Sequence, residues 1–144
     1  MKSQAFAAIV AAFLAVGAIP AAAQHMNAPE GPCASTVSAT CNKQALETSD
    51  RDLNRLYHDV STMLRPADRE RLQQLERSWI SYRDTFCAAE YALYAGGSGG
   101  PAARFACLDA LTRHQIGELK SAYGWKLAKS GPAIRGRYAN TDVH

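Results

Sequence analysis

Between Arg69 and Leu93, apolar and polar residues follow one another with the spacing of a helix. The apolar or small residues recur at alternating steps of three and four, at Leu72, Leu75, Trp79, Tyr82, Phe86, Ala89 and Leu93. This spacing is typical of a helix that packs against other helices along one seam. Pro66 precedes the stretch, where its missing N–H costs nothing, and the glycines from Gly96 onward end it. We therefore predict a long helix over 69–93 with this seam buried.

Two further segments show the same period. The first, over 40–64, ends at Arg65-Pro66, and the other runs over 102–123 after the glycines. No stretch has the alternation of a strand. We therefore predict an all-α fold, a small antiparallel three-helix bundle made of a long helical hairpin plus a third helix, over residues 38–123. The remainder, 124–144, has three glycines and few apolar residues, and we expect it to be a flexible C-terminal tail.

The N-terminus has the features of an export signal. Lys2 precedes an apolar run over 6–19, and Ala21–Ala23 form a small-residue cleavage site. We expect residues 1–23 to be a signal peptide and 24–37 an N-terminal arm of the mature chain, which is then periplasmic or secreted. No later segment is apolar enough to predict a membrane span after cleavage.

Four cysteines, an even number, lie in the mature part: Cys33, Cys41, Cys87 and Cys107. In a small exported protein this number predicts two disulfides, and the spacing lacks the close pairs of a zinc site. In an antiparallel bundle all four come to the glycine end, so their level along the bundle does not decide the pairing. Cys33–Cys41 with Cys87–Cys107 is feasible. We favour Cys41–Cys87 with Cys33–Cys107, because that pairing joins three separate segments.

The order of several short motifs resembles a known family. These motifs are Asp50-x-x-Leu53-Asn54-x-x-Tyr57, Trp79-Ile80-x-Tyr82-Arg83-Asp84-x-x-Cys87, Gly96-Gly97-Ser98 and Cys107-Leu108-x-x-Leu111-Thr112. Together they resemble the lysozyme inhibitor LprI-like family of small exported bacterial proteins, from about Cys33 to Leu119. The chain departs from that pattern at Glu76, where a Gln is usual, and at Gln115, where an Arg is usual. The resemblance implies a lysozyme inhibitor that occludes the lysozyme cleft.

Most of the motif residues have a structural interpretation that we prefer. Arg83 and Asp84 lie at the level where Arg83 can reach Glu47 or Asp50 on the first helix, so we expect an ion pair that fixes helix register. Asn54 and Tyr57 share one helical face, either as partner contacts or, as we prefer, as a satisfied amide and a phenol at the core edge. Trp79 and Tyr82 lie on the predicted seam, and we assign them to the core, with Thr112 among the structural motif residues.

The glycine-rich loop is the best candidate for partner binding. Gly96, Gly97 and Ser98 can enter a cleft as a narrow backbone segment, and Tyr94 and Arg104 flank them as hot-spot residue types. The alternative interpretation is a flexible connection between two helices.

Other classes of function lack support in the sequence. The histidines have no metal-binding spacing, and no nucleophile has a partner set, so we expect no metal, no cofactor and no catalysis. The mature chain has a net charge of only about +2, without a basic run that predicts nucleic-acid binding. We expect a binding protein with a protein partner, lysozyme by resemblance; the other hypotheses are a non-catalytic periplasmic structural or assembly protein, and a small-ligand binder using the bundle core. The sequence does not predict the oligomeric state.

Overall fold

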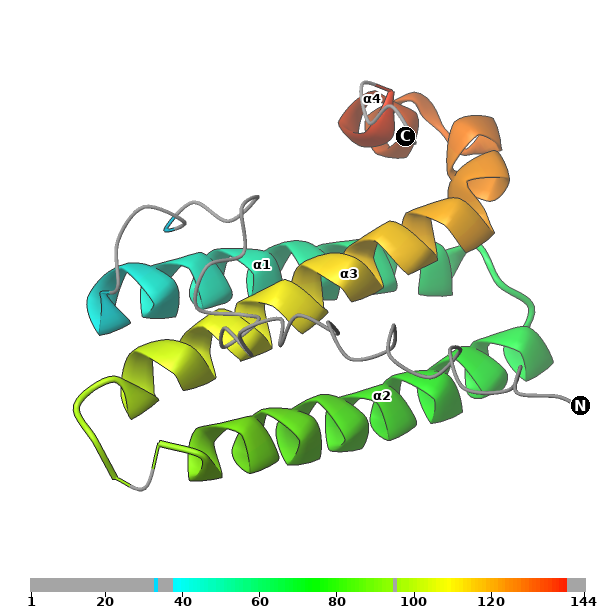
Figure 1. The fold of residues 1–144 in the computed structure, drawn as a ribbon. Coiled ribbons are helices and arrows are strands. Elements are labelled where there is room, and N and C mark those ends of the chain that lie inside the picture. Colours follow the sequence, from blue (N-terminus) through cyan, green and yellow to red (C-terminus); the bar gives the residue numbers. More distant parts are fainter. Residues whose placement is uncertain (1–32, 34–37, 95, 140–144) are drawn as a thin grey trace, which may run out of the picture.

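The protein is seen here as a computed structural model that describes residues 33, 38–94 and 96–139. The described part is all-α and contains no strand (Figure 1). Its helices are α1 (Ala39–Thr62), α2 (Pro66–Ala92), α3 (Gly100–Lys129) and the short α4 (Pro132–Tyr138). The prediction of an all-α, disulfide-stapled bundle is therefore confirmed. The predicted signal peptide and most of the N-terminal arm lie outside the described residues.

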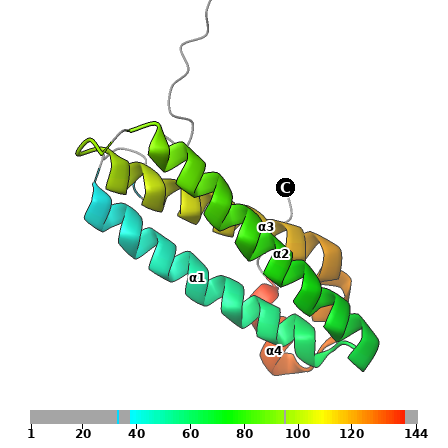
Figure 2. The same cartoon turned by 90° about the horizontal axis from the view of Figure 1, so that it is seen from below.

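The three long helices run up, down and up, with α3 packed against both α1 and α2 (Figures 1 and 2). Ser38 begins α1 as its N-cap, because its side chain accepts a hydrogen bond from the Cys41 backbone N–H. Pro66 lies in the first turn of α2 and Pro101 in the first turn of α3, where neither loses an intrahelical bond. No helix in the described part is long and apolar enough to cross a membrane.

The inward face of α2 differs from the predicted seam. Only Leu72 and Cys87 of this helix are buried, and Trp79 is half-buried against the core. The other large seam residues are exposed: Leu75, Tyr82, Phe86 and Leu93. The prediction that Tyr82 belongs to the core was therefore wrong. The physical reason is that α3 presents buried polar groups to α2, so the polar residues Glu76 and Arg83 turn inward and rotate the apolar seam to one side.

The apolar core lies toward the far end of the bundle from the glycine loop. It consists of Leu53, Leu56, Val60, Leu64, Leu72, Leu119 and Leu127. Ile134 and Tyr138 of α4 pack against it from the C-terminal side. The tail expected over 124–144 is thus helical almost throughout its described part, which ends at Ala139. Its order has a polar cause as well, because Arg137 and the Tyr138 hydroxyl both bond to the buried carboxylate of Asp59.

The disulfides pair differently from the arrangement that we favoured. Cys33 is bonded to Cys41, and Cys87 is bonded to Cys107. The pairing follows from the packing, since α2 lies against α3, which places Cys87 opposite Cys107 with a Cα–Cα distance of 5.7 Å. Cys41, at the start of α1, is bonded instead to Cys33, which lies before the helix and eight positions ahead of Cys41 in the sequence. No free cysteine is found among the described residues.

Candidate partner-binding surface

The loop between α2 and α3 is a tight reversal whose tip is exposed. Gly96 has a φ of +79°, a conformation that L side chains rarely adopt, so glycine is required there. The Gly97 N–H donates to the Tyr94 carbonyl at 2.7 Å, and the Gly100 N–H donates to the Gly97 carbonyl at 3.0 Å. Gly96, Gly97 and Ser98 are all exposed. The tip is therefore a narrow turn of defined backbone, with Ser98 as its one side chain among these three residues.

Two tyrosine rings support this turn from below. A Cβ on Gly100 would lie 2.8 Å from the Tyr91 ring, so only glycine allows that close approach. The Tyr94 ring lies beneath Gly99, where a Cβ would be 3.7 Å away. Tyr94 is half-buried, and its hydroxyl is buried without a hydrogen-bond partner among the described residues. Arg104 is exposed, and its guanidinium lies over the Tyr91 ring at 5.8 Å.

The base of the loop is fixed by covalent and polar contacts. The Cys87–Cys107 disulfide joins α2 to α3 with both cysteines fully buried. The buried Asn42 side chain donates from Nδ2 to the Ala102 carbonyl at 3.0 Å, which ties the start of α1 to the start of α3. The loop thus projects from a part of the bundle that has little freedom to move.

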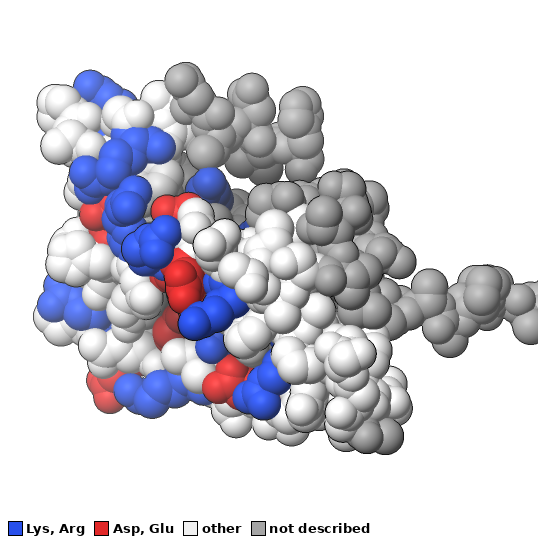
Figure 3. Space-filling model, turned by 90° about the vertical axis from the view of Figure 1, so that its left-hand side faces the viewer, with Lys and Arg blue, Asp and Glu red and all other residues white. Residues whose placement is uncertain are grey.

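The charge is distributed unevenly between the two ends of the bundle. Residues 39–118 carry ten Lys or Arg and eleven Asp or Glu, whereas residues 119–139 carry five Lys or Arg and no acid. Figure 3 looks onto the end of the molecule that carries the loop. Its lower right is mostly uncharged, and Lys and Arg predominate at the top, at the height of α4 in Figure 1. The excess positive charge therefore belongs to the end of α3 and to α4, away from the loop.

Several of the motif residues meet in one polar cluster at the centre of the bundle. Arg83 Nη1 donates to Asp50 Oδ1 at 3.0 Å and to Thr112 Oγ1 at 3.1 Å. Its Nε donates to Asp84 Oδ1 at 3.0 Å, and its Cζ lies 5.0 Å from the centre of the Trp79 ring. One guanidinium thus contacts α1 and α3 from α2, which fits the interpretation that it fixes helix register. Asn54, by contrast, is exposed and does not join this cluster.

The two positions that depart from the family pattern lie against each other. The Glu76 side chain is hydrogen-bonded to Gln115, which is buried in α3. Burial raises the pKa of the Glu76 carboxyl, while Arg83 and the bond to Gln115 lower it. Its Oε2 is buried and has no hydrogen-bond partner among the described residues. Tyr57 is half-buried nearby, and burial followed by the Glu76 charge raises its pKa.

Sequence reasoning missed two buried carboxylate sites. Asp109 of α3 accepts from Ser49 Oγ at 2.8 Å and from Arg113 Nε at 3.0 Å. Asp59 of α1 accepts from Arg137, with the shortest distance 2.8 Å, and from the Tyr138 hydroxyl at 2.9 Å. Asp59 lies next to Val60 on the buried face of α1. Because a buried carboxylate is costly unless it is paired, its position on this face is the signal in the sequence that a basic residue elsewhere pairs with it.

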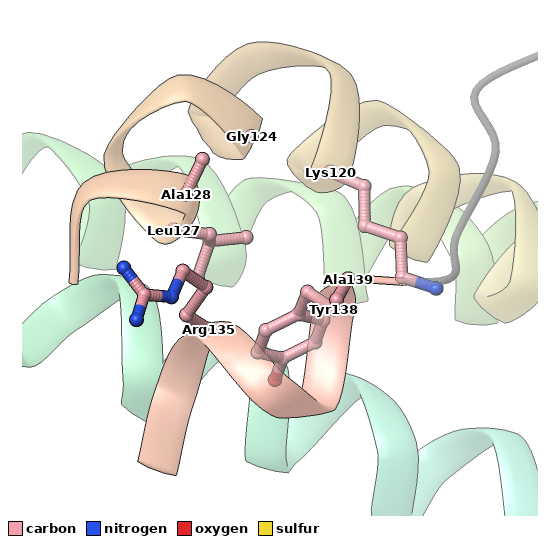
Figure 4. A pocket seen from close by; sticks show the side chains of 7 residues that line it. All are labelled: Lys120, Gly124, Leu127, Ala128, Arg135, Tyr138 and Ala139. Carbon is pink, nitrogen blue, oxygen red and sulfur yellow. The ribbon is translucent and has the colours of Figure 1, made fainter. Parts of the chain in front are cut away.

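Two of the surface hollows lined by described residues are large enough for small molecules, and neither of these two lies inside the bundle core. One, of about 350 Å³, follows the groove between α1 and α3 beside the Cys33–Cys41 disulfide. The other, of about 280 Å³, lies between the end of α3 and α4 (Figure 4). In Figure 4 the Lys120 amine and the Arg135 guanidinium lie on opposite sides of the Tyr138 ring, so they do not converge on one anion. Among the described residues, no group of acidic, histidine or cysteine side chains could hold a metal ion.

Comparison with known proteins identifies the family to which the chain belongs. No solved structure matches the chain significantly. An uncharacterized protein of Rhizobium meliloti (strain 1021) is 32% identical over 118 residues, which span 70% of this chain and 83% of that protein. The family described as "Lysozyme inhibitor LprI" matches residues 32–119, from the first disulfide to the core residue Leu119. The chain therefore belongs to the lysozyme inhibitor LprI family.

Proposed function

We propose that this protein is a periplasmic or secreted inhibitor of lysozyme that binds the enzyme with its glycine loop and performs no catalysis of its own. The observation that carries the proposal is membership of an inhibitor family over the region that forms the bundle. The two disulfides support the location, because such bonds persist in oxidising compartments.

The geometry of the loop supports a role in occluding a cleft. A tip of two glycines and Ser98 approaches a concave surface closely, since there is little side chain to hold the backbones apart. A base fixed by Cys87–Cys107 lowers the entropy cost of ordering the loop on binding. We assign the tip contacts to Gly96, Gly97 and Ser98. Arg104 contributes a contact at the base.

Tyr94 has a supporting role in this proposal. Its ring lies under Gly99 and its hydroxyl points into the protein, so it shapes the turn more than it offers a contact.

The distribution of charge supports the choice of this end. Animal lysozymes of the common type are basic, so a basic surface on the inhibitor opposes their approach. The basic segment begins at Lys120, twenty residues along α3 from Gly100, which is ~30 Å at ~1.5 Å per residue. That separation exceeds the screening length of about 8 Å at physiological ionic strength. A basic enzyme can therefore meet the loop without strong repulsion from the C-terminal end.

The test is inhibition of cell-wall lysis by purified mature protein, with a loop variant and a matched control at the other end of the bundle. Ser98→Trp fills the exposed tip without straining the backbone, because Ser98, unlike Gly96, does not need a positive φ. Ala67→Trp adds the same bulk at an exposed position near the start of α2. We expect the loop variant to lose roughly tenfold or more in inhibition, as for a contact at the centre of an interface. The control should inhibit like the parent.

Two results would contradict the proposal. If the parent inhibits and both variants inhibit equally well, the loop is only a helix connection. If the folded, oxidised parent inhibits no lysozyme, the alternative of a non-catalytic periplasmic structural or assembly protein is favoured.

A further inference from the structure

The end of α3 and the short helix α4 form a basic end of the molecule. Residues 119–139 carry five Lys or Arg and no acid, and the five residues that follow in the sequence add one acid, Asp142. Arg137 is paired with the buried carboxylate of Asp59. The other four side chains form no ion pair with the described residues: Lys120, Lys126, Lys129 and Arg135. This end therefore keeps an excess of positive charge.

The neighbouring elements do not offset this charge. The start of α2 lies at the same end of the bundle (Figure 2) and carries three Arg and two acids over 65–71. One of these acids, Asp68, is paired with both Arg65 and Arg71. The nearest acid along α3 is Glu118, which lies 3.7 Å from the ring of His114. The whole end is therefore basic and attracts an anionic partner.

Trp125 lies exposed among these charges. Its exposed fraction is 58%, and the ammonium groups of Lys126 and Lys129 lie 4.5 Å and 5.4 Å from the centre of its ring. Ala122 and Ala128, three residues before and three residues after it on the helix, are exposed and small. The indole ring therefore stands clear of bulky neighbours, with two cations beside it.

We propose that this end of the molecule binds the surface of an anionic phospholipid bilayer. We call the residues involved the basic patch: Lys120, Trp125, Lys126, Lys129 and Arg135. Trp is enriched at membrane–water interfaces, where its ring sits at the level of the headgroups, and Lys keeps its ammonium group in the water beside it. No helix of the described part can cross a membrane, so the protein would lie on the bilayer and not span it.

The arrangement of the patch favours an extended anionic surface over one small anion. In Figure 4 the amine of Lys120 and the guanidinium of Arg135 lie on opposite sides of the Tyr138 ring and do not converge. Separate cations of this kind can each meet a different phosphate of a bilayer. The exposed Trp125 favours a bilayer over a soluble polyanion, because only the bilayer offers an interface that takes up the indole ring.

Binding by the basic patch would also orient the glycine loop. Gly100, at the base of the loop, and Trp125 are ~37 Å apart along α3 at ~1.5 Å per residue. Figure 1 shows the loop and α4 at opposite ends of the bundle. A molecule bound through the patch therefore holds its loop away from the lipid. The patch begins where the match to the family ends, at residue 119, so the proposal does not rest on lysozyme inhibition.

The experiment measures co-sedimentation of the purified mature protein with vesicles of phosphatidylglycerol mixed with phosphatidylcholine, and with vesicles of phosphatidylcholine alone. Lys129→Glu reverses one charge of the patch. Lys43→Glu is the matched control, because Lys43 is an exposed lysine near the start of α1, where Asn42 is bonded to the start of α3. Both variants change the net charge equally. Trp125→Ala removes the indole ring and leaves the charge unchanged.

We expect the parent to bind the mixed vesicles, to bind less as salt is added, and to leave phosphatidylcholine alone in solution. Each Lys near an anionic surface contributes about fivefold in affinity, so Lys129→Glu should weaken binding by at least about fivefold. Trp125→Ala should weaken it by a similar factor. Lys43→Glu should change it by less than about twofold, because its distance from the bilayer exceeds the screening length. Circular dichroism should show the same helix content in all variants.

Other outcomes overturn the proposal. A parent that stays in solution with the mixed vesicles at low salt shows that the patch does not bind a bilayer. Equal weakening by Lys129→Glu and Lys43→Glu shows that only net charge matters. Full binding by Trp125→Ala removes the reason to prefer a bilayer and favours a soluble polyanion. Inhibition of lysozyme without vesicles is measured separately, so failure of the membrane proposal is distinguishable from failure of the proposed function.

Discussion

Removal of the Cys87–Cys107 disulfide tests both the pairing and the rigidity of the loop base. The change is the double variant Cys87→Ala/Cys107→Ala, and the matched control is Cys33→Ala/Cys41→Ala. The first bond closes a segment with a sequence separation of 20 and the second a segment with a separation of 8. Because the loop-closure entropy of the unfolded chain grows with the length of the closed segment, the first bond should stabilise the protein more.

The expected cost follows from these lengths. Loop-closure entropy gives about 3 kcal/mol for Cys87–Cys107 and about 2.5 kcal/mol for Cys33–Cys41. Cys87 and Cys107 are both fully buried, so loss of their sulfur atoms also leaves a small void that adds up to about 1 kcal/mol. Cys41 is only partly buried, and its site can relax more easily. We therefore expect the free energy of unfolding to fall by about 3–4 kcal/mol in the first variant and by about 2–3 kcal/mol in the second.

The assay is denaturant unfolding followed by circular dichroism, with the free energy extrapolated to water. In thermal unfolding the first variant should lose roughly 10–20 °C, as expected for a domain of this size. The same variant should inhibit lysozyme less well while folded, because its loop base is free to move. A larger loss of stability in the control than in the first variant would refute the reasoning. A Cys41–Cys87 peptide in a digest of the oxidised parent would refute the pairing itself.

Three further substitutions test the buried polar groups. Thr112→Val should cost about 1–2 kcal/mol of unfolding free energy in chemical denaturation, because its fully buried hydroxyl accepts from Arg83. Glu76→Gln should raise the thermal midpoint at pH 7, and this gain should vanish below pH 4.5. The reason is that burial raises the pKa of the carboxyl, so its ionisation costs stability as the pH rises through that pKa. A lower midpoint of the variant at pH 7 would contradict this sign. Burial and the hydrogen bond to Asp59 raise the pKa of Tyr138 to about 12, so the parent should lose stability between pH 10 and 12. In alkaline unfolding curves, Tyr138→Phe should reduce this loss.

The case of α2 shows how far the hydrophobic pattern could predict the fold. The three-four spacing correctly predicted a long helix, and Pro66 and the glycines correctly marked its ends. It could not identify the buried face, because Leu72 and Trp79 belong to the predicted seam and also to the face that is turned inward. The inward face also contains Glu76 and Arg83, residues that a hydrophobic pattern assigns to solvent.

The candidate site shows a similar division. The sequence alone showed the glycines, Ser98 and the need for a turn, because a Gly-rich segment between two helices is typical of a turn. The support of that turn by Tyr91 and the inward position of the Tyr94 hydroxyl were not visible, because they depend on the path of the backbone at Gly99 and Gly100.

By itself, the sequence determined the local properties of this protein: helices from periodicity, their ends from proline and glycine, two disulfides from four cysteines, and the family from ordered motifs. Each of these depends on residues near one another in the chain. Tertiary structure alone decided which cysteines pair, because all four lie at one end and only the packing of α2 on α3 sets Cys87 opposite Cys107. It also ordered the C-terminal segment, since Asp59, far away in sequence, provides the buried charge that Arg137 neutralises. Such contacts join residues that no local pattern relates, so their energy enters only when the helices pack.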